Sequence, residues 1–396
     1  MFKKLKNYDY ILMFSPIVLA SFGIIMIYSA SMVTAVVEGH ESTYYLVKQA
    51  QWFVISLVGF ILFSVIPYKK YEKYMVWNVV IALAMLLGVL LFGTSRGNAT
   101  RWISVGPVLI QPAEFVKLGI ILYLASVYSK KQHYIDDFRK GVLPPLILTA
   151  FILALIVLQP DIGSAVTTFL VACAIIFSSG MRYKHIILLG FVSILVVAAA
   201  IPSMVTEERI SRFTGAYQPF ADPENAGHHL IQSYLAIGGG GITGEGLGQS
   251  VQKLGFLFGA HTDFIMAVIA EELGTIGVLL VLGLLALIVL RGLYVSLKCR
   301  DSFGALIAVG ISSMIGIQTF INLGSISGIL PITGITLPFV SYGGSSLLIL
   351  MVSMGILNNI ASTLKKDEQD SADSKPVQHV QNNKFVTYRG GRKWSS

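Results

Sequence analysis

Two oppositely charged side chains stand three residues apart at the start of an otherwise apolar stretch. At this spacing Glu114 and Lys117 would share one face of a helix. The stretch 112–129 is long enough to cross a bilayer, where ionisable groups are costly and usually mark a functional site. Such a pair either contacts a charged substrate or locks two helices together, and the spacing favours neither role over the other.

A second ionisable group, Asp263, lies directly before another apolar stretch, within the run Ala260-His261-Thr262-Asp263-Phe264. In a purely structural role, either Asp263 or Thr262 would cap the helix that follows. Glu271 and Glu272 come about two helical turns later. On one continuous helix Glu271 would be nearer to the face of Asp263, and Glu272 would face away. Either glutamate could be a polar packing group between helices.

The composition indicates that these groups belong to a membrane protein. Of the 396 residues, 54% are hydrophobic and 13% are charged, whereas a soluble domain carries roughly 25% charged residues. So few charges cannot cover the surface of a soluble enzyme, and so apolar a chain is not intrinsically disordered. The two cysteines, Cys173 and Cys299, are too few for a disulfide framework.

Ten apolar stretches have about the length of a membrane-spanning helix, which is roughly 20 residues. We therefore predict an all-α integral membrane protein whose membrane domain covers residues 1–364. The polar segment 365–396 has no periodicity, and we predict a mobile cytoplasmic tail there. The ten predicted spans are 10–32, 46–66, 74–93, 112–129, 142–159, 163–180, 184–203, 263–291, 302–325 and 340–362.

Most of the 29 lysines and arginines fall on one side of these spans. The positive-inside rule places that side, and with it both termini, in the cytoplasm. The net charge of +8 then reflects topology and anionic lipid headgroups, so we expect membrane lipid and no nucleic acid as a partner. The basic residues elsewhere are Lys48, Arg96, Arg101, Lys117, Arg209, Arg212 and Lys253.

The largest segment outside the cytoplasm, 204–263, connects the seventh and eighth predicted spans. A connection of this length is usually functional or disordered, and residues 231–237 within it favour a short helix at the membrane interface. The glycine-rich run 238–248 suits close backbone approach and turns with positive φ. It lacks the surroundings of a nucleotide-binding motif, although its amides could contact a phosphate.

Arg96 and Arg101 lie in another outer segment, 93–112, where no topological rule requires a positive charge. A bound anion would explain them, and the neighbouring Trp102 is typical of a membrane interface. The sequence contains no histidine and cysteine spacing that indicates a zinc site, and no nucleophile elbow.

The outer motifs together resemble the SEDS family of cell-wall proteins, which contains FtsW, RodA and SpoVE. The resemblance runs in order through residues 10–362 and all ten predicted spans. The residues 222–227 and 232–233 are more similar to the FtsW subfamily than to RodA. The family motifs in this chain are Arg101-Trp102-Ile103, 111–118, 159–163, 261–265, 271–274 and 334–346.

The resemblance implies a peptidoglycan glycosyltransferase that polymerises the lipid-linked precursor lipid II on the outer face of the cytoplasmic membrane. It also implies septal cell-wall synthesis in cell division, with a class B penicillin-binding protein and other divisome proteins as partners. The family's key carboxylate falls on Asp263. Its substrate-binding positions fall on Arg101, Trp102, Glu114 and Lys117, and we expect Gln111, Glu271, Ser341 and Gly343 to support them.

In the mechanism that follows from this resemblance, Asp263 takes the proton of an acceptor sugar hydroxyl as a general base. Arg101 and Lys117 neutralise the departing undecaprenyl pyrophosphate, Glu114 holds Lys117, and Trp102 packs on a sugar or prenyl chain. A divalent cation, Mg²⁺ or Mn²⁺, could assist at the pyrophosphate, although no cage of carboxylates indicates one.

Other functions remain compatible with the sequence. A polymerase of the RodA type would serve elongation, and one of the SpoVE type would serve sporulation. A lipid II flippase would also need many spans and a lipid substrate, although we find no internal repeat that would favour transport. A structural division scaffold is a further alternative. The clustering of unusual charges on the outer side favours surface chemistry over the last two.

Overall fold

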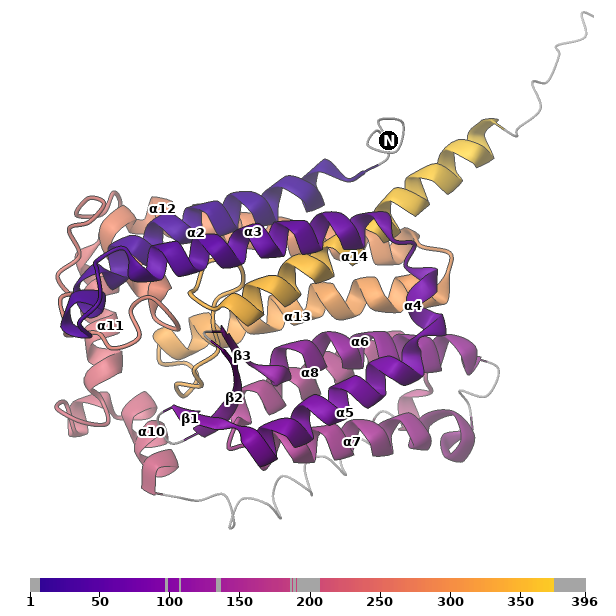
Figure 1. Cartoon of the computed structure of the whole chain (residues 1–396), viewed down its shortest axis with the longest axis horizontal. Coiled ribbons are helices and arrows are strands. Elements are labelled where there is room, and N and C mark those ends of the chain that lie inside the picture. The colour runs from indigo at the N-terminus through magenta and orange to yellow at the C-terminus, as the bar shows by residue number, and fades with distance from the viewer. Residues whose placement is uncertain are drawn as a thin grey trace, which may run out of the picture.

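The computed structural model describes residues 8–96, 99–106, 108–132, 137–185, 187, 190 and 207–373. Long helices dominate these residues and lie side by side in one bundle (Figure 1). The α-helices are α2 (Tyr10–Val37), α3 (Tyr44–Val65), α4 (Lys69–Lys73), α5 (Met75–Phe92), α6 (Pro112–Lys130), α7 (Leu143–Val157), α8 (Ile162–Ser178), α10 (Glu207–Tyr217), α11 (His228–Gly239), α12 (Ile265–Lys298), α13 (Ser302–Ile326) and α14 (Gly344–Asp373). A π-helix, η2 (Phe138–Val142), leads into α7, and a 3₁₀ helix, η3 (Pro219–Ala221), follows α10.

Eight helices of the described residues are long and apolar enough to cross a membrane. They are α2, α3, α5, α6, η2 with α7, α12, α13 and α14, and the shorter apolar helix α8 coincides with the sixth predicted span. The prediction of an all-α membrane fold is confirmed. Most of the predicted span 184–203 lies outside the described residues.

The two ends of the bundle correspond to the two predicted sides of the membrane, because the lysine-rich connections lie at one end and the long outer segments lie at the other. The start of α2, the basic helix α4 and the end of α14 lie at one end (Figure 1). The helices α10 and α11 and three short strands lie at the other end. The first end is therefore the cytoplasmic one, because it carries the lysine-rich connections.

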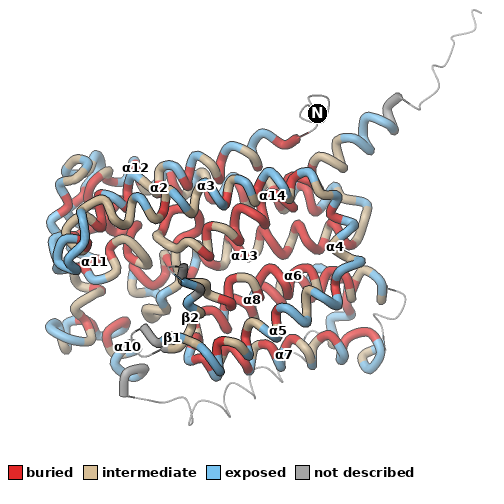
Figure 2. Tube along the Cα trace, viewed as in Figure 1, coloured by how far each residue is buried: buried red, intermediate tan, exposed pale blue. Residues whose placement is uncertain are grey.

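Burial separates the inner helices from those that face lipid. Most residues of α6, α13 and α14 are buried, whereas α3 and α5 contain many exposed residues (Figure 2). Many of these exposed residues are apolar. Trp77 and Leu91 of α5 are examples of such exposed apolar residues. A surface of this kind is stable only against lipid, so the exposure pattern agrees with the membrane assignment.

The helix α12 is interrupted at Gly274, which corrects the expectation of one continuous helix over 263–291. Gly274 has φ 63° and ψ −162°, so the helical hydrogen bonds are broken there. The amides of Glu245 and Gly246 donate to the carbonyls of Glu271 and Glu272, at 2.9 and 3.0 Å. The glycine-rich run thus replaces the missing helical partners of α12.

Glycines are needed where this run touches α12. A Cβ atom at Gly240 would collide with the carbonyl of Ala270, and one at Gly244 would collide with the carbonyl of Glu272. Gly244 also has φ 80°, a conformation that other residues rarely adopt. The prediction of close backbone approach and turns with positive φ is confirmed.

A small antiparallel sheet fills part of the outer segment 93–112, where the sequence analysis predicted no strands. Its strands are β1 (Thr94–Arg96), β2 (Ala99–Val105) and β3 (Val108–Ile110), in the order β1-β2-β3. Trp102 pairs with Thr94 on one side, and Ile103 pairs with Ile110 on the other. These short strands hold Arg101 and Trp102 above the bundle.

Two further predictions concern the connecting segments. The short helix expected at 231–237 is present as α11. The helix α14 continues to Asp373, so the beginning of the predicted tail is helical. Its lysine, glutamate, glutamine and alanine residues are good helix formers, which explains the extension. The remaining tail residues, 374–396, lie outside the described residues.

Candidate active site

A cavity of about 770 Å³ opens at the extracytoplasmic end of the bundle. Its walls come from the end of α2, the start of α3, the strand β2, the residues before α12 and the segment 334–346. Segments far apart in the sequence therefore share one space. The predicted site residues that line it are Arg101, Trp102, Gln111, Asp263 and Gly343.

Asp263 lies in the loop immediately before α12 and is half-buried. The hydroxyl of Thr262 donates to Asp263 Oδ1 at 2.7 Å. From α13, the side-chain amide of Asn322 donates to the backbone carbonyl of Asp263 at 2.8 Å and to that of Ile335 at the same distance. The N-cap residue of α12 is Phe264, rather than Thr262 or Asp263 as the structural alternative expected, and Phe264 makes no side-chain capping hydrogen bond.

A second cavity, of about 310 Å³, also has Asp263 in its wall. Asp263, Arg101 and Gly334 line both cavities. His229 of α11 also lines the smaller one, and burial lowers the pKa of His229 below its ordinary value of 6.5. Asp263 thus lies where two spaces meet, an arrangement that suits a group acting between two bound molecules.

Arg101 is held at this junction by Asp161. The two side chains are 3.6 Å apart, between Arg101 Nη1 and Asp161 Oδ1, and Arg101 Nη2 donates to the carbonyl of Pro160 at 3.4 Å. Gln111 donates to the other oxygen of Asp161 at 3.2 Å. Asp161 also accepts from the amide of Ser164 as the N-cap of α8. One carboxylate therefore connects α8 to two residues of the cavity wall.

The structure places Glu114 and Lys117 away from this cavity. Lys117 Nζ lies 2.7 Å from Glu114 Oε1, both side chains are buried in α6, and neither is among the described residues that line the cavity. This geometry supports a structural ion pair, but both partners belong to α6, so the pair lies within one helix rather than locking two helices together. A contact between this pair and substrate stays a prediction.

The other predicted supporting residues shape the segments around the cavity. The hydroxyl of Ser341 accepts from the amide of Leu337 at 2.9 Å and so stabilises the turn that leads to α14. The amide of Gly343 donates to Gln49 of α3 at 3.3 Å. Glu271 accepts from the amide of Val251 at 2.8 Å and therefore fastens the long outer loop to α12.

Sequence reasoning missed an aromatic cluster in the cavity wall. The ring of Tyr45 lies 4.6 Å from that of His261 and 5.1 Å from that of Tyr342, between centroids. Burial lowers the pKa of His261 to about 4, so this imidazole is neutral at physiological pH. Rings of this kind can pack on sugars or prenyl chains. The cluster was missed because no spacing in the sequence predicts that α3 contacts the segment 334–346.

Lys48 was also missed as a site residue, although the sequence contained a signal for it. It lines the cavity from α3, and its ammonium group lies 4.2 Å from the centre of the Tyr44 ring. Lys48 is one of the few basic residues outside the cytoplasmic side. The same argument that selected Arg101 would have selected it.

Comparison with known proteins now identifies the family. Residues 10–366 match the family model of FtsW, RodA and SpoVE, which is described as a cell cycle protein. The chain belongs to this family. It is 47% identical over 376 residues to the probable peptidoglycan glycosyltransferase FtsW of Bacillus subtilis (strain 168), covering 92% of this chain and 93% of that relative. It is 38% identical over 355 residues to the stage V sporulation protein E of the same organism, covering 89% and 96%.

Solved structures of the family have the same fold. A chain from "Structural coordination of polymerization and crosslinking by a peptidoglycan synthase complex" matches with a TM-score of 0.76 at 27% identity, covering 90% of this chain and 98% of its own. The crystal structure of the rod shape determining protein RodA of Thermus thermophilus matches with a TM-score of 0.66 at 26% identity, covering 89% and 96%. This FtsW/RodA/SpoVE member is thus similar in fold to a chain of a peptidoglycan synthase complex and to a rod shape determining protein.

Proposed function

We propose that this protein is a peptidoglycan glycosyltransferase of the FtsW type, which polymerises lipid II on the outer face of the cytoplasmic membrane. The observation that carries the proposal is the position of Asp263 in the walls of two cavities, which Arg101 also lines. The relatives that are called probable peptidoglycan glycosyltransferases support it, because they align over nearly the whole chain.

The reaction joins two lipid-linked sugars. A hydroxyl oxygen of the acceptor attacks the anomeric carbon of the donor, and the bond from that carbon to the pyrophosphate oxygen breaks. Asp263 accepts the hydroxyl proton, and undecaprenyl pyrophosphate leaves with the bonding electron pair. General-base assistance of this kind contributes typically about 10²–10⁴-fold. One molecule in each cavity would place the reacting hydroxyl within reach of Asp263.

The leaving pyrophosphate needs positive charge close to it. Arg101 and Lys48 are cationic residues of the cavity wall, and a cation stabilises the negative charge that develops on the leaving oxygen. Trp102 and the Tyr45 ring would pack against the apolar parts of the substrate. Lys117 and Glu114 would act indirectly in this scheme, by keeping α6 in place under Gln111.

No step of this proposed mechanism uses a divalent cation. Among the described residues there is no group of three or more histidine, cysteine, aspartate or glutamate side chains that could hold a metal ion. Mg²⁺ commonly binds through one or two carboxylates together with substrate phosphates. Assistance by Mg²⁺ or Mn²⁺ would therefore require Asp263 and the pyrophosphate together, and it stays a prediction.

The same comparisons support a cellular role in division. The chain is a multi-pass membrane protein, and a septal role in cell division is favoured by its greater identity to FtsW than to the sporulation protein of one organism. A class B penicillin-binding protein would supply crosslinking, since a similar structure comes from a complex that couples polymerization and crosslinking. Localisation of a tagged copy to the septum rather than the sidewall tests the division role.

Polymerisation of purified lipid II by the purified protein with its partner tests the activity. We expect glycan strands from the native chain and a loss of at least about 100-fold in rate for Asp263→Asn, a variant of the same size. A folded Asp263→Asn protein with full activity would contradict the assignment of the base. A flippase would form no glycan from lipid II in detergent, where there is no membrane to cross.

A further inference from the structure

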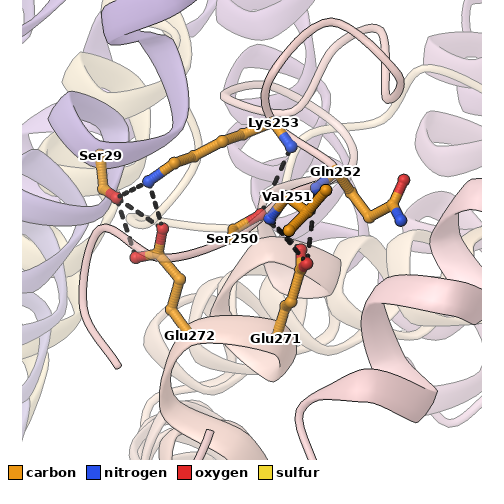
Figure 3. A network of polar contacts seen from close by, with 7 residues as sticks. All are labelled: Ser29, Ser250, Val251, Gln252, Lys253, Glu271 and Glu272. Atoms are coloured by element: carbon orange, nitrogen blue, oxygen red, sulfur yellow. Dashed lines mark hydrogen bonds and ion pairs between the residues drawn. The ribbon is translucent and has the colours of Figure 1, made fainter. Parts of the chain in front are cut away.

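A buried ion pair joins the two ends of the segment 253–272, which we call the Asp263 loop. Lys253 Nζ lies 2.6 Å from Glu272 Oε1, and the exposed fractions of the two side chains are 1% and 0%. Ser29 of α2 completes the cluster (Figure 3). Its hydroxyl oxygen is 2.7 and 2.8 Å from the two carboxylate oxygens and 2.9 Å from Lys253 Nζ.

The neighbouring glutamate holds the same segment from a second side. Glu271 accepts from the amides of Val251 and Gln252, at 2.8 and 3.4 Å, and from the hydroxyl of Ser250 (Figure 3). Two consecutive carboxylates of α12 thus bind four consecutive residues of the outer loop. The hydrogen bonds between Glu272 and Ser29 of α2 confirm the expectation of a polar packing group between helices. The contacts with residues 250–253 of the outer loop were not predicted, because they depend on the loop that returns along α12.

Asp263 lies about midway along the chain between Lys253 and Glu272, the two residues of the ion pair. Asp263 is the tenth residue after Lys253 and the ninth residue before Glu272. The ion pair therefore closes the intervening chain into a loop with Asp263 near its middle. At the far side of that loop, Asn322 holds the Asp263 carbonyl from α13. The loop is attached to α2 at its base and to α13 at its tip.

Stability alone is a poor explanation for charges at this depth. Desolvation of two charges largely offsets their attraction, so apolar residues of similar volume are often as stabilising as a buried ion pair. An ion pair with fixed hydrogen-bond partners does restrict the geometry of the segments that it joins. This property is useful where a catalytic carboxylate must keep one position.

We propose that Lys253, Glu272 and Ser29 are positioning residues that hold the Asp263 loop at the junction of the two cavities. They touch no reacting atom in this scheme and act through the backbone of the loop. The inference rests on the proposed role of Asp263 as the general base. Displacement of a catalytic group by about 1 Å can lower a rate about 100-fold.

The test compares the single variant Lys253→Met with the double variant Lys253→Met/Glu272→Gln. The single variant leaves a buried unpaired carboxylate, so we expect lower thermal stability and a lower kcat with lipid II. The double variant removes both charges, so we expect the stability to recover while kcat stays about 100-fold below that of the native protein with KM unchanged. Recovery of kcat together with stability in the double variant would overturn the positioning role.

Arg291→Gln is the matched control, since Arg291 pairs with Asp9 at the cytoplasmic end of the same helix, at 2.7 Å. We expect it to lower stability and to leave kcat unchanged for the folded protein. A fall of kcat in this control as large as in the double variant would also overturn the proposal, because any lost ion pair on α12 would then have the same effect.

Hydrogen exchange separates this inference from the function on which it rests. The amides of Thr262 and Phe264 both donate to the carbonyl of Gly259 and report on the order of the loop. We expect faster exchange at these amides in the double variant and native exchange in Asp263→Asn. Native exchange in the double variant would contradict the positioning role, whereas an active Asp263→Asn protein would contradict only the assignment of the base.

Discussion

Asn322 of α13 holds Asp263 through the backbone, by a 2.8 Å hydrogen bond from its side-chain amide to the Asp263 carbonyl. The same amide nitrogen lies 2.8 Å from the carbonyl of Ile335. One buried residue therefore joins two segments of the cavity wall, the loop before α12 and the segment that follows α13. The hydroxyl of the adjacent Thr262 donates to the Asp263 carboxylate, while Asn322 of α13 fixes the Asp263 backbone.

Replacement of Asn322 by leucine tests this attachment. The variant leaves two part-buried carbonyl groups without this donor, which costs at most about 1–3 kcal/mol for each group. We expect kcat for lipid II polymerisation to fall about tenfold or more. Gln318→Leu, one turn earlier on α13 and equally buried, is the control and should leave kcat within about twofold. Equal losses in both variants would argue against a specific role of Asn322.

Replacement of Arg101 by alanine tests the electrostatic role of the cavity wall. Loss of one group that stabilises developing negative charge typically lowers kcat by about 10²–10³-fold, and we expect a loss of about 100-fold here. Arg101→Lys should recover part of the rate, because it keeps the charge without the two-pronged contact to Asp161 and Pro160. Initial rates with purified lipid II measure both effects, and an Arg101→Ala rate near that of the native protein would exclude this role.

The low pKa of His261, about 4, predicts that acid destabilises the protein. In the unfolded chain this imidazole titrates near 6.5, so between about pH 4 and 6.5 the unfolded state binds more protons than the folded state. Stability should therefore rise with pH through this window and level off above it, by about 3 kcal/mol at most.

His261→Gln removes this contribution. We expect the pH dependence of thermal unfolding in detergent to flatten between about pH 4 and 6.5 in the variant, relative to the native chain. An unchanged pH dependence would mean that His261 is not the group responsible.

Gly244→Ala tests the contact between the glycine-rich run and α12. The added methyl group would collide with the Glu272 carbonyl at a position whose φ is 80°, so we expect a loss of about 1–3 kcal/mol in stability. Gly238→Ala is the control, since Gly238 lies in α11 and an added Cβ would meet no atom within 4 Å beyond its chain neighbours and the nearby backbone of its own helix. There we expect unchanged or slightly higher stability, because alanine favours helix. Comparable losses at both positions would refute the close contact.

The sequence by itself determined the membrane fold, its orientation and the outermost site residues. The spans are predicted from local hydrophobicity, and their orientation from the uneven distribution of lysine and arginine between the two sides. Neither prediction requires knowledge of long-range contacts. Arg101 and Asp263 could also be selected from local sequence. Arg101 is a positive charge in an outer segment, and Asp263 is a charged residue directly before an apolar span.

Only the tertiary structure decided which of these charges meet. Asp161 reaches both Arg101 and Gln111, and Lys253 reaches Glu272, because non-adjacent segments pack together in the bundle. The break at Gly274 could not be foreseen from helical periodicity, since it depends on backbone donors supplied by the returning loop. For Glu114 and Lys117 the spacing allowed two roles, and burial of both side chains in one short ion pair now favours the structural one. Long-range packing, which no local pattern encodes, made each of these distinctions.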